Sequence, residues 1–366
     1  MDPTIHKTIT SFLSKETKKL GSSVLKKVLI VLIYASQNIC INQACEMSGV
    51  YSHSKQILNL FKKYTIREVE RFFLNISLAM FKSSIQKLNL RSIKLAIDIT
   101  EEPYYGKLKK GDIFIWSRTP KSPPGATGCF KYLTISCTNT NCKLILANLL
   151  LAPGYRLEDI IPSLLDLIRK IIPIKQVTFD RGFHNNSLIY KLESLKIKYL
   201  IFCTKKEWSK EVLLKLKSGE SCSIIRELEI RRAMSRKSFK AKFIIIKDYQ
   251  FDKHERSYDW IFVTNLSFNS IKNTISSYRN RWGIETVFRV LKQDFRIKTT
   301  SKHQSVRLMC MCFSMLFYNI WQISKMFINN FIKAKSFLCV IRFGFKVRFG
   351  FECMYEKEIL KFFGFG

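Results

Sequence analysis

The order of apolar and amphipathic segments between residues 93 and 203 constrains the fold more than any other feature of the sequence. The predicted elements are, in chain order, a strand over 93–100, a hairpin of 130–138 and 143–151, a helix over 157–172, a strand over 175–180, a helix over 185–195 and a buried strand over 198–203. This order predicts an α/β fold in which helices cover the faces of a mixed sheet.

Two of these predicted strands end in an aspartate, Asp98 and Asp180. The element order suits the ribonuclease H-like arrangement, in which the first and fourth strands lie side by side. Asp98 and Asp180 are then expected close together at neighbouring strand ends. A single aspartate at a strand end is most often structural, so each of them needs support from elsewhere in the chain.

That support comes from the predicted helical segment 271–297, where an acid is surrounded by cations. At about 100° per residue, four side chains lie within about 40° of Glu285, namely Tyr278, Arg281, Arg289 and Lys292. A solvated helix would use such a stripe as a ladder of salt bridges. The neighbouring aromatic residues favour instead a helix packed on the sheet, with Glu285 directed into a site. Gly283 either allows close packing or marks the true start of the helix.

An acid and several bases on one face suit metal-assisted chemistry at phosphorus. Hard divalent cations prefer carboxylate oxygens, which Asp98, Asp180 and Glu285 would supply. Arg281 and Lys292 would bind phosphates beside the reacting bond and stabilise its charge. Tyr278 and Arg289 are further candidates for binding DNA phosphate, and Tyr278 could also stack on or position a base. The competing interpretation is that Arg281 and Lys292 form salt bridges to the sheet, and that Tyr278 only packs.

The charge of the chain agrees with a polyanionic partner. There are 62 Lys and Arg against 28 Asp and Glu, which gives a net charge of +34. Nucleic acid is the natural counterpart, because each neutralised phosphate releases a counterion. Codon bias toward Lys explains arginine pairs such as Arg231-Arg232 less well.

Secretion and membrane insertion are not expected. The 11 cysteines include no C-x-x-C pair and resemble reduced intracellular thiols. We find no signal peptide at the N-terminus. The most apolar stretch, 308–321, is shorter than the roughly 20 residues of a membrane span. We therefore expect a cytoplasmic protein with no membrane partner.

Three further regions complete the predicted organisation. Residues 1–90 form a helical domain, in which 41–63 resemble a helix-turn-helix around Gly49; DNA recognition and plain bundle packing both remain open. The catalytic domain spans 91–330 and holds a β-rich insertion at about 206–266. Residues 331–366 form a basic aromatic tail in which RFGF occurs twice.

The spacing Y-x2-R-x3-E-x6-K of Tyr278, Arg281, Glu285 and Lys292 resembles the signature of DDE transposases from bacterial and archaeal insertion sequences. The segment 177–183, VTFDRGF, is similar to the second-aspartate motif of this group, and 95–100, LAIDIT, to its first-aspartate strand. The following EEPYYGK, 101–107, resembles the archaeal halophile-type branch. The resemblance covers about residues 90–325 and includes the β-rich insertion.

The resemblance implies a metal-dependent enzyme that cuts and joins DNA. Asp98, Asp180 and Glu285 would hold two Mg²⁺ ions, with Mn²⁺ as a substitute. The enzyme would bind the terminal inverted repeats of its element, pair two ends, as in a homodimer, and join the freed 3′-hydroxyl to target DNA in the nucleoid. An aromatic residue of the insertion, Trp208 or Trp260, would contact a flipped base. His184 is expected near a helix start rather than as a base.

Two alternatives share the same carboxylates, and a third does without them. A ribonuclease H-like nuclease would cleave without joining, and a decayed transposase would bind DNA without cleaving it. A basic RNA-binding protein would show salt-sensitive binding without metal-dependent cleavage.

Overall fold

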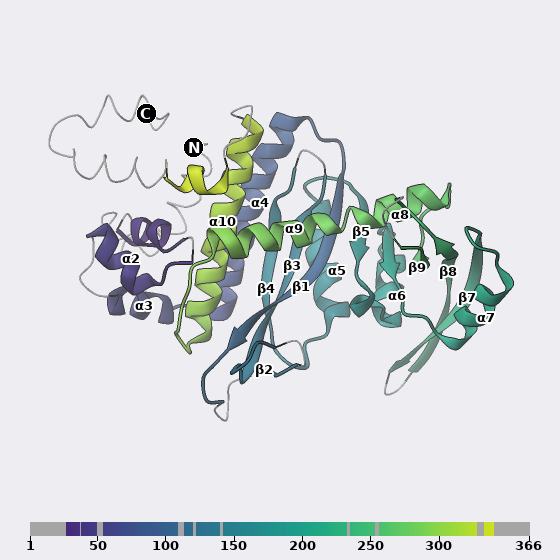
Figure 1. Ribbon diagram of the computed structural model, residues 1–366, viewed down its shortest axis with the longest axis horizontal. Coiled ribbons are helices and arrows are strands. Elements are labelled where there is room, and N and C mark those ends of the chain that lie inside the picture. Colours follow the sequence, from purple (N-terminus) through teal and green to yellow (C-terminus); the bar gives the residue numbers. More distant parts are fainter. Residues whose placement is uncertain are drawn as a thin grey trace.

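The computed structural model (Figure 1) describes residues 27–36, 38–49, 54–108, 113–119, 122–139, 142–232, 235–252, 256–327 and 333–339. The helices are α2 (Ile41–Ser48), α3 (Lys55–Lys62), α4 (Ile66–Leu88), α5 (Leu157–Arg169), α6 (Asn186–Ser194), α7 (Glu207–Lys215), α8 (Ile271–Arg279), α9 (Trp282–Val290) and α10 (Gln304–Phe327). The strands are β1 (Ile93–Tyr104), β2 (Trp116–Ser117), β3 (Gly128–Cys137), β4 (Ile145–Leu151), β5 (Ile174–Phe179), β6 (Tyr199–Phe202), β7 (Ser221–Arg232), β8 (Ser235–Tyr249) and β9 (Tyr258–Thr264). A 3₁₀ turn, η1 (Arg181–Phe183), and a π-helix, η2 (Leu291–Phe295), complete the elements.

The described strands form one nine-stranded sheet in the order β2-β3-β1-β5-β6-β9-β8-β7, with β4 also paired to β3. β3 is antiparallel to β1 and to β4, whereas β5 is parallel to both β1 and β6. The inner part, β4-β3-β1-β5-β6, has the strand order and directions of the ribonuclease H-like fold. The predicted fold class is confirmed, and so is the side-by-side placement of the first and fourth predicted strands.

The predicted insertion continues the same sheet. β9 pairs antiparallel with β6, and β8 and β7 follow outward as a long hairpin. It also contains a helix, α7, which the sequence analysis did not foresee. A second unforeseen element is β2, a two-residue strand between β1 and β3 in which Trp116 pairs with Cys129.

The predicted helical segment 271–297 is interrupted. α8 ends at Arg279, α9 begins at Trp282, and α9 continues into η2. Gly283 therefore lies at the start of a helix, which is one of the two roles considered for it. A Cβ atom there would meet Thr138 at an ordinary van der Waals distance of 3.5 Å.

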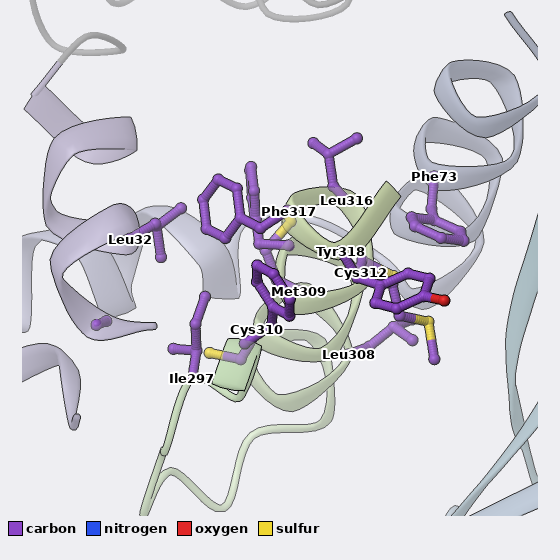
Figure 2. Packing of buried hydrophobic residues seen from close by; sticks show 14 of the residues in the cluster. Leu32, Phe73, Ile297, Leu308, Met309, Cys310, Cys312, Leu316, Phe317 and Tyr318 are labelled. Atoms are coloured by element: carbon purple, nitrogen blue, oxygen red, sulfur yellow. The ribbon is translucent and has the colours of Figure 1, made fainter. Parts of the chain in front are cut away.

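Two large apolar clusters lie on the two faces of the sheet. One joins β1 and β3 to α5 and α6, through residues such as Leu95 and Ile97. The other packs α4, α10 and the 27–35 helical segment against β3, β4 and η2. Figure 2 shows the second cluster, in which Leu32, Phe73 and Ile297 surround side chains of α10.

α10 is the one described helix that is long and apolar enough to cross a membrane, by length and composition alone. Its apolar window, within 304–326, is 78% buried inside the protein. Asn319 of this helix exchanges hydrogen bonds with the main chain of Ile145 in β4, at 2.8 and 2.9 Å. α10 therefore has the contacts of a core helix.

The N-terminal helices lie at one end of the long axis of the molecule, and α7 with β7 lies at the other (Figure 1). α2 ends at Gly49, whose φ of 64° is a left-handed conformation that glycine adopts easily. α3 packs on α10 through Phe61, which stacks on Phe313. The turn at 50–53 and the repeated RFGF of the tail lie outside the described residues.

Candidate active site

The parallel pairing of β1 with β5 brings the two predicted aspartates together. Ile97 is the register partner of Phe179, so Asp98 and Asp180 follow at the same level of neighbouring strands. β5 ends there, whereas β1 continues to Tyr104, so the prediction that Asp98 lies at a strand end is wrong. Side chains alternate along a strand, so Asp98 shares a face with Ala96, which packs under α9. The main-chain N–H of Ile99 donates to Asp98 Oδ1 at 2.8 Å and helps to orient this carboxylate.

Arg281 links the first aspartate to the predicted glutamate. Its Nη1 lies 3.4 Å from Asp98 Oδ2, and its Nη2 lies 2.6 Å from Glu285 Oε1. The Arg281 side chain is 7% exposed, against 20% for Asp98 and 49% for Glu285. The guanidinium therefore lies under the acids, while Glu285 faces solvent. Arg281 Nε is buried without a hydrogen-bond partner among the described residues.

Tyr278 reaches the second aspartate from α8. Its hydroxyl donates to Asp180 Oδ1 at 3.3 Å, and the Arg281 guanidinium lies 5.6 Å from its ring centre. The ring is 4% exposed and packs against Phe202 and Phe262. Tyr278 thus packs through its ring while its hydroxyl reaches Asp180, and its contact with DNA stays a prediction.

The break between α8 and α9 does not separate the signature residues. Arg281 is the residue before α9, and its N–H donates to the carbonyl of Tyr278 at 2.9 Å. The break therefore keeps Tyr278 and Arg281 directed at the strand ends while Glu285 follows one turn into α9. Their convergence agrees with the stripe that the sequence predicted on one continuous helix, although the helix is in two parts.

Lys292 lies in the π-helical turn η2. Its Nζ donates to the carbonyl of Glu101 in β1 at 3.5 Å. A π-helical turn is uncommon and often lies at a functional site. Arg289, the remaining predicted phosphate ligand, is exposed on α9.

Several ionisable groups of the site have perturbed pKa values. Burial raises the pKa of Asp98, and the negative charges of Asp180 and Glu285 add to this effect, while the Ile99 N–H and Arg281 oppose it. Burial also raises the pKa of Tyr278. Burial and the neighbouring Arg296 lower the pKa of Lys292, although the residue as a whole is exposed. A buried carboxylate that has other acids close by binds a cation readily, because the cation relieves the repulsion between their negative charges.

The carboxylate oxygens fit a divalent metal ion, but Asp98, Asp180 and Glu285 are not close enough together to bind one ion. Asp98 and Asp180 provide hard oxygen donors side by side on the inner strand β1 and just after the inner strand β5. Among the described residues, no group of three or more His, Cys, Asp or Glu is close enough to hold one ion. The Arg281 guanidinium lies between Asp98 and Glu285 and contacts both.

The other aromatic and basic candidates pack into the structure. The indole of Trp260 lies against Phe202, Phe262 and Tyr278, and its Nε1 is buried without a described partner. The guanidinium of Arg226 lies 4.3 Å from the ring centre of Trp208, which is at the start of α7.

His184 comes just before Asn185, whose side chain caps α6. Burial lowers its pKa to about 4, and Lys206 adds to this shift. The imidazole is therefore neutral at pH 7, next to a helix start as predicted.

Sequence reasoning missed a second charged cluster, around Glu102 at the far end of β1. Its partners are Tyr132, Arg296 and Arg307. These residues lie far apart in the sequence, so no local motif predicts the cluster. The only signal was the position of Glu102, four residues after Asp98 and hence on the same face of the strand.

The strand order and directions place the chain among the ribonuclease H-like proteins. A family model described as "Transposase DDE domain" matches residues 132–320, just over half of the chain, and the protein belongs to this family. The match includes Asp180 and Glu285, whereas Asp98 precedes it. No curated protein matches the chain.

A similar solved structure is the cryo-EM structure of the piggyBac transposase synaptic complex with hairpin DNA. Its TM-score is 0.45 and its sequence identity is 14%, over 74% of this chain and 56% of that chain. The present chain thus spans little more than half the length of that protein.

Proposed function

We propose that the protein is an insertion-sequence transposase of prokaryotic type that cleaves DNA at the ends of its element and joins the freed 3′-hydroxyl to target DNA. The observation that carries this proposal is the convergence of Asp98 and Asp180 with the Arg281–Glu285 pair at one sheet edge. Membership in the transposase family supports it. The enzyme would act on DNA in the cytoplasm as a homodimer that pairs two ends.

Each residue of the site has a proposed part in the reaction. Asp98, Asp180 and Glu285 would hold two Mg²⁺ ions, or Mn²⁺ in their place. Such ions activate the attacking oxygen and stabilise negative charge at phosphorus. Arg281 and Lys292 would bind the phosphates on either side of the scissile bond, with Arg289 as an outer contact. Tyr278 would orient Asp180 through its hydroxyl.

The opening of the Arg281–Glu285 pair is part of this proposal. A DNA phosphate offers Arg281 a bidentate partner, and the buried Nε, which has no hydrogen-bond partner among the described residues, would donate to the same phosphate. Once Arg281 turns to the phosphate, Glu285 is released to join Asp98 and Asp180. DNA and metal binding would then reinforce each other.

End recognition is proposed for α3. Its inner face packs in the core through Ile57 and Phe61, while its outer face is exposed and carries residues suited to DNA, namely Lys55, Gln56, Asn59, Lys62 and Lys63. Gln and Asn read adenine in the major groove, and Lys binds phosphates. Replacing Gln56 and Asn59 by Ala should reduce the preference for the element's end over random DNA. An unchanged preference would leave α3 as a packing helix.

The decisive experiment is cleavage of labelled DNA that carries the element's own end, with Mg²⁺ or with EDTA, by the wild type and by Asp180→Asn. Nicking at the end that requires metal and is lost in the variant supports the proposal. Binding without nicking by the wild type would indicate a decayed enzyme. A strand-transfer assay with a 3′-hydroxyl donor then separates a transposase from a nuclease that does not join.

A further inference from the structure

Glu102 is the centre of a buried ion cluster that the proposed catalytic steps do not use. Its side chain is 12% exposed. Its Oε2 accepts a hydrogen bond from the Tyr132 hydroxyl at 3.1 Å and lies 3.7 Å from Arg307 Nη1, and its Oε1 lies 3.5 Å from Arg296 Nη2. One carboxylate thus connects β1 and β3 with the residue after η2 and with α10.

Two of the three partners of Glu102, Tyr132 and Arg307, are buried. The Arg307 side chain is 6% exposed, and its guanidinium lies 5.4 Å from the ring centre of Tyr104 and 5.0 Å from that of Phe130. Its Nε donates to the carbonyl of Ser301 at 2.7 Å. Glu102 is therefore held firmly on the side of the sheet and α10, and it offers this fixed carboxylate to the Arg296 side chain, which is 37% exposed.

Glu102 and Asp98 attach the segment formed by α9 and η2 to β1 at two points. They lie on the same face of β1, four residues or about 13 Å apart. Arg281, before α9, contacts Asp98, and Arg296, after η2, contacts Glu102. Lys292 lies between these two attachments and reaches β1 at Glu101 O. These contacts, together with the Asn38 side-chain amide that donates to the carbonyls of Lys292 and Gln293 at 3.1 and 3.0 Å, fix the height of Lys292 above the sheet.

We infer that Glu102 is a positioning residue, which holds η2 on β1 and so places Lys292 over the DNA phosphate. This inference rests on the proposed function, in which Lys292 binds a phosphate beside the scissile bond. It goes beyond that proposal because Glu102 is not among the residues proposed to hold the metal ions or the DNA. Glu102 affects the position of Lys292 through its ion pair with Arg296 and through the π-helical turn η2.

A double-mutant cycle between Glu102→Gln and Lys292→Ala tests the inference. DNA affinity is measured with the labelled end DNA over a range of salt concentrations. Each single variant should bind DNA roughly tenfold more weakly. The salt slope, which is the slope of the logarithm of the binding constant against the logarithm of the salt concentration, should become shallower by about 0.9, the value for one phosphate contact. If Glu102 acts through Lys292, the double variant should also be roughly tenfold weaker, rather than about 100-fold as for independent sites.

The matched control is Glu207→Gln, which removes the same charge from a side chain that is 79% exposed on α7. It should keep the wild-type salt slope, which shows that the change in net charge is not the cause. Glu102→Asp keeps the charge on a shorter side chain and should recover part of the affinity. Losses that add in the double variant would overturn the inference and give Glu102 a purely structural role.

A third variant covers the case in which Glu102→Gln does not fold. Tyr132→Phe removes only the hydroxyl that donates to Glu102. It should weaken DNA binding by roughly threefold, the value of one hydrogen bond, and have no effect when Lys292 is already Ala. An equal effect in both backgrounds would overturn the inference. If Lys292→Ala alone changes nothing, the inference fails, while loss of cleavage in Asp180→Asn still upholds the proposed catalytic triad.

Discussion

The two halves of the candidate site are held in different ways. Asp98 and Asp180 are placed by the backbone ladder between β1 and β5, which also builds the core of the sheet. Glu285 is half-exposed on α9 and held through the guanidinium of Arg281, and Lys292 lies in a π-helical turn. The strand half is therefore built with the fold. The helix half depends on side-chain ion pairs, in which a metal ion or a phosphate can replace one of the two partners.

The largest effect is expected for the strand half. Asp98→Asn should abolish metal-dependent cleavage, with a loss of about 10³-fold or more, because several kcal/mol of charge stabilisation disappear. The thermal midpoint should not fall, since the backbone ladder is unchanged and burial already disfavours the charged form of Asp98. Cleavage assays and thermal unfolding measure the two effects. Retention of a tenth of the activity would remove Asp98 from the site.

A smaller loss, with an opposite effect on metal binding, is expected for Arg281→Gln. Cleavage should fall by about 10²-fold, as for other groups that stabilise charge in the transition state. The affinity for Mn²⁺ without DNA should rise roughly tenfold, because opening the ion pair is no longer needed and about 1.4 kcal/mol is recovered. Titration calorimetry measures this affinity.

The control for Arg281→Gln is Lys272→Gln, which removes a positive charge from the exposed first turn of α8. Its Mn²⁺ affinity should equal that of the wild type. If Arg281→Gln also leaves the Mn²⁺ affinity unchanged, the guanidinium does not compete with the metal, and the contrast between the two halves of the site is weaker than the geometry suggests.

The same contrast explains what the sequence could predict. The strand half was predictable, because apolar runs that end in Asp98 and Asp180 define both the strands and their order. The spacing of Tyr278, Arg281 and Glu285 also survives the break at residues 280–281, since the chain there stays close to helical: Arg281 has φ −57° and ψ −33°. Local sequence determines these features.

What the sequence could not give are contacts between distant segments. The ion pair of Arg281 with Asp98 joins residues 183 positions apart, and the pair of Arg296 with Glu102 joins residues 194 apart. The strand β2 was missed because its two residues are defined by β3 rather than by a pattern of their own. Such features follow from tertiary packing, which overrides local preference.

A modest effect is expected for Tyr278→Phe. The variant removes the hydroxyl that donates to Asp180 but keeps the ring among Phe202 and Phe262. Cleavage should fall by about three- to tenfold, the value of one hydrogen bond, with an unchanged thermal midpoint. Single-turnover cleavage rates at saturating DNA measure it. A loss as large as that of Asp98→Asn would mean that the phenol takes part in the chemistry.

The smallest effect on activity is expected for Glu70→Gln, which tests whether the strand half is as rigid as its backbone ladder implies. Glu70 of α4 accepts a hydrogen bond from the N–H of Leu150 in β4 at 2.9 Å. Burial raises its pKa from 4.5 to about 7, although the Leu150 N–H and Arg67 oppose this shift. Because the pKa of Glu70 is higher in the folded than in the unfolded protein, its protonation stabilises the fold. This stabilisation is complete below pH 4.5 and is lost as the pH rises through 7, where the folded protein releases the proton.

Gln keeps an acceptor oxygen and does not titrate, so the variant should lack this pH dependence. The wild type should lose stability relative to Glu70→Gln between pH 4.5 and about 7, by on the order of 3 kcal/mol. Denaturant unfolding at several pH values measures the difference. Cleavage should be unchanged at each pH, because β4 is separated from β1 by β3 and the ladder holds Asp98 in place. A parallel change in cleavage would show that the sheet transmits the state of its edge strand to the acids, and that both halves of the site are adjustable.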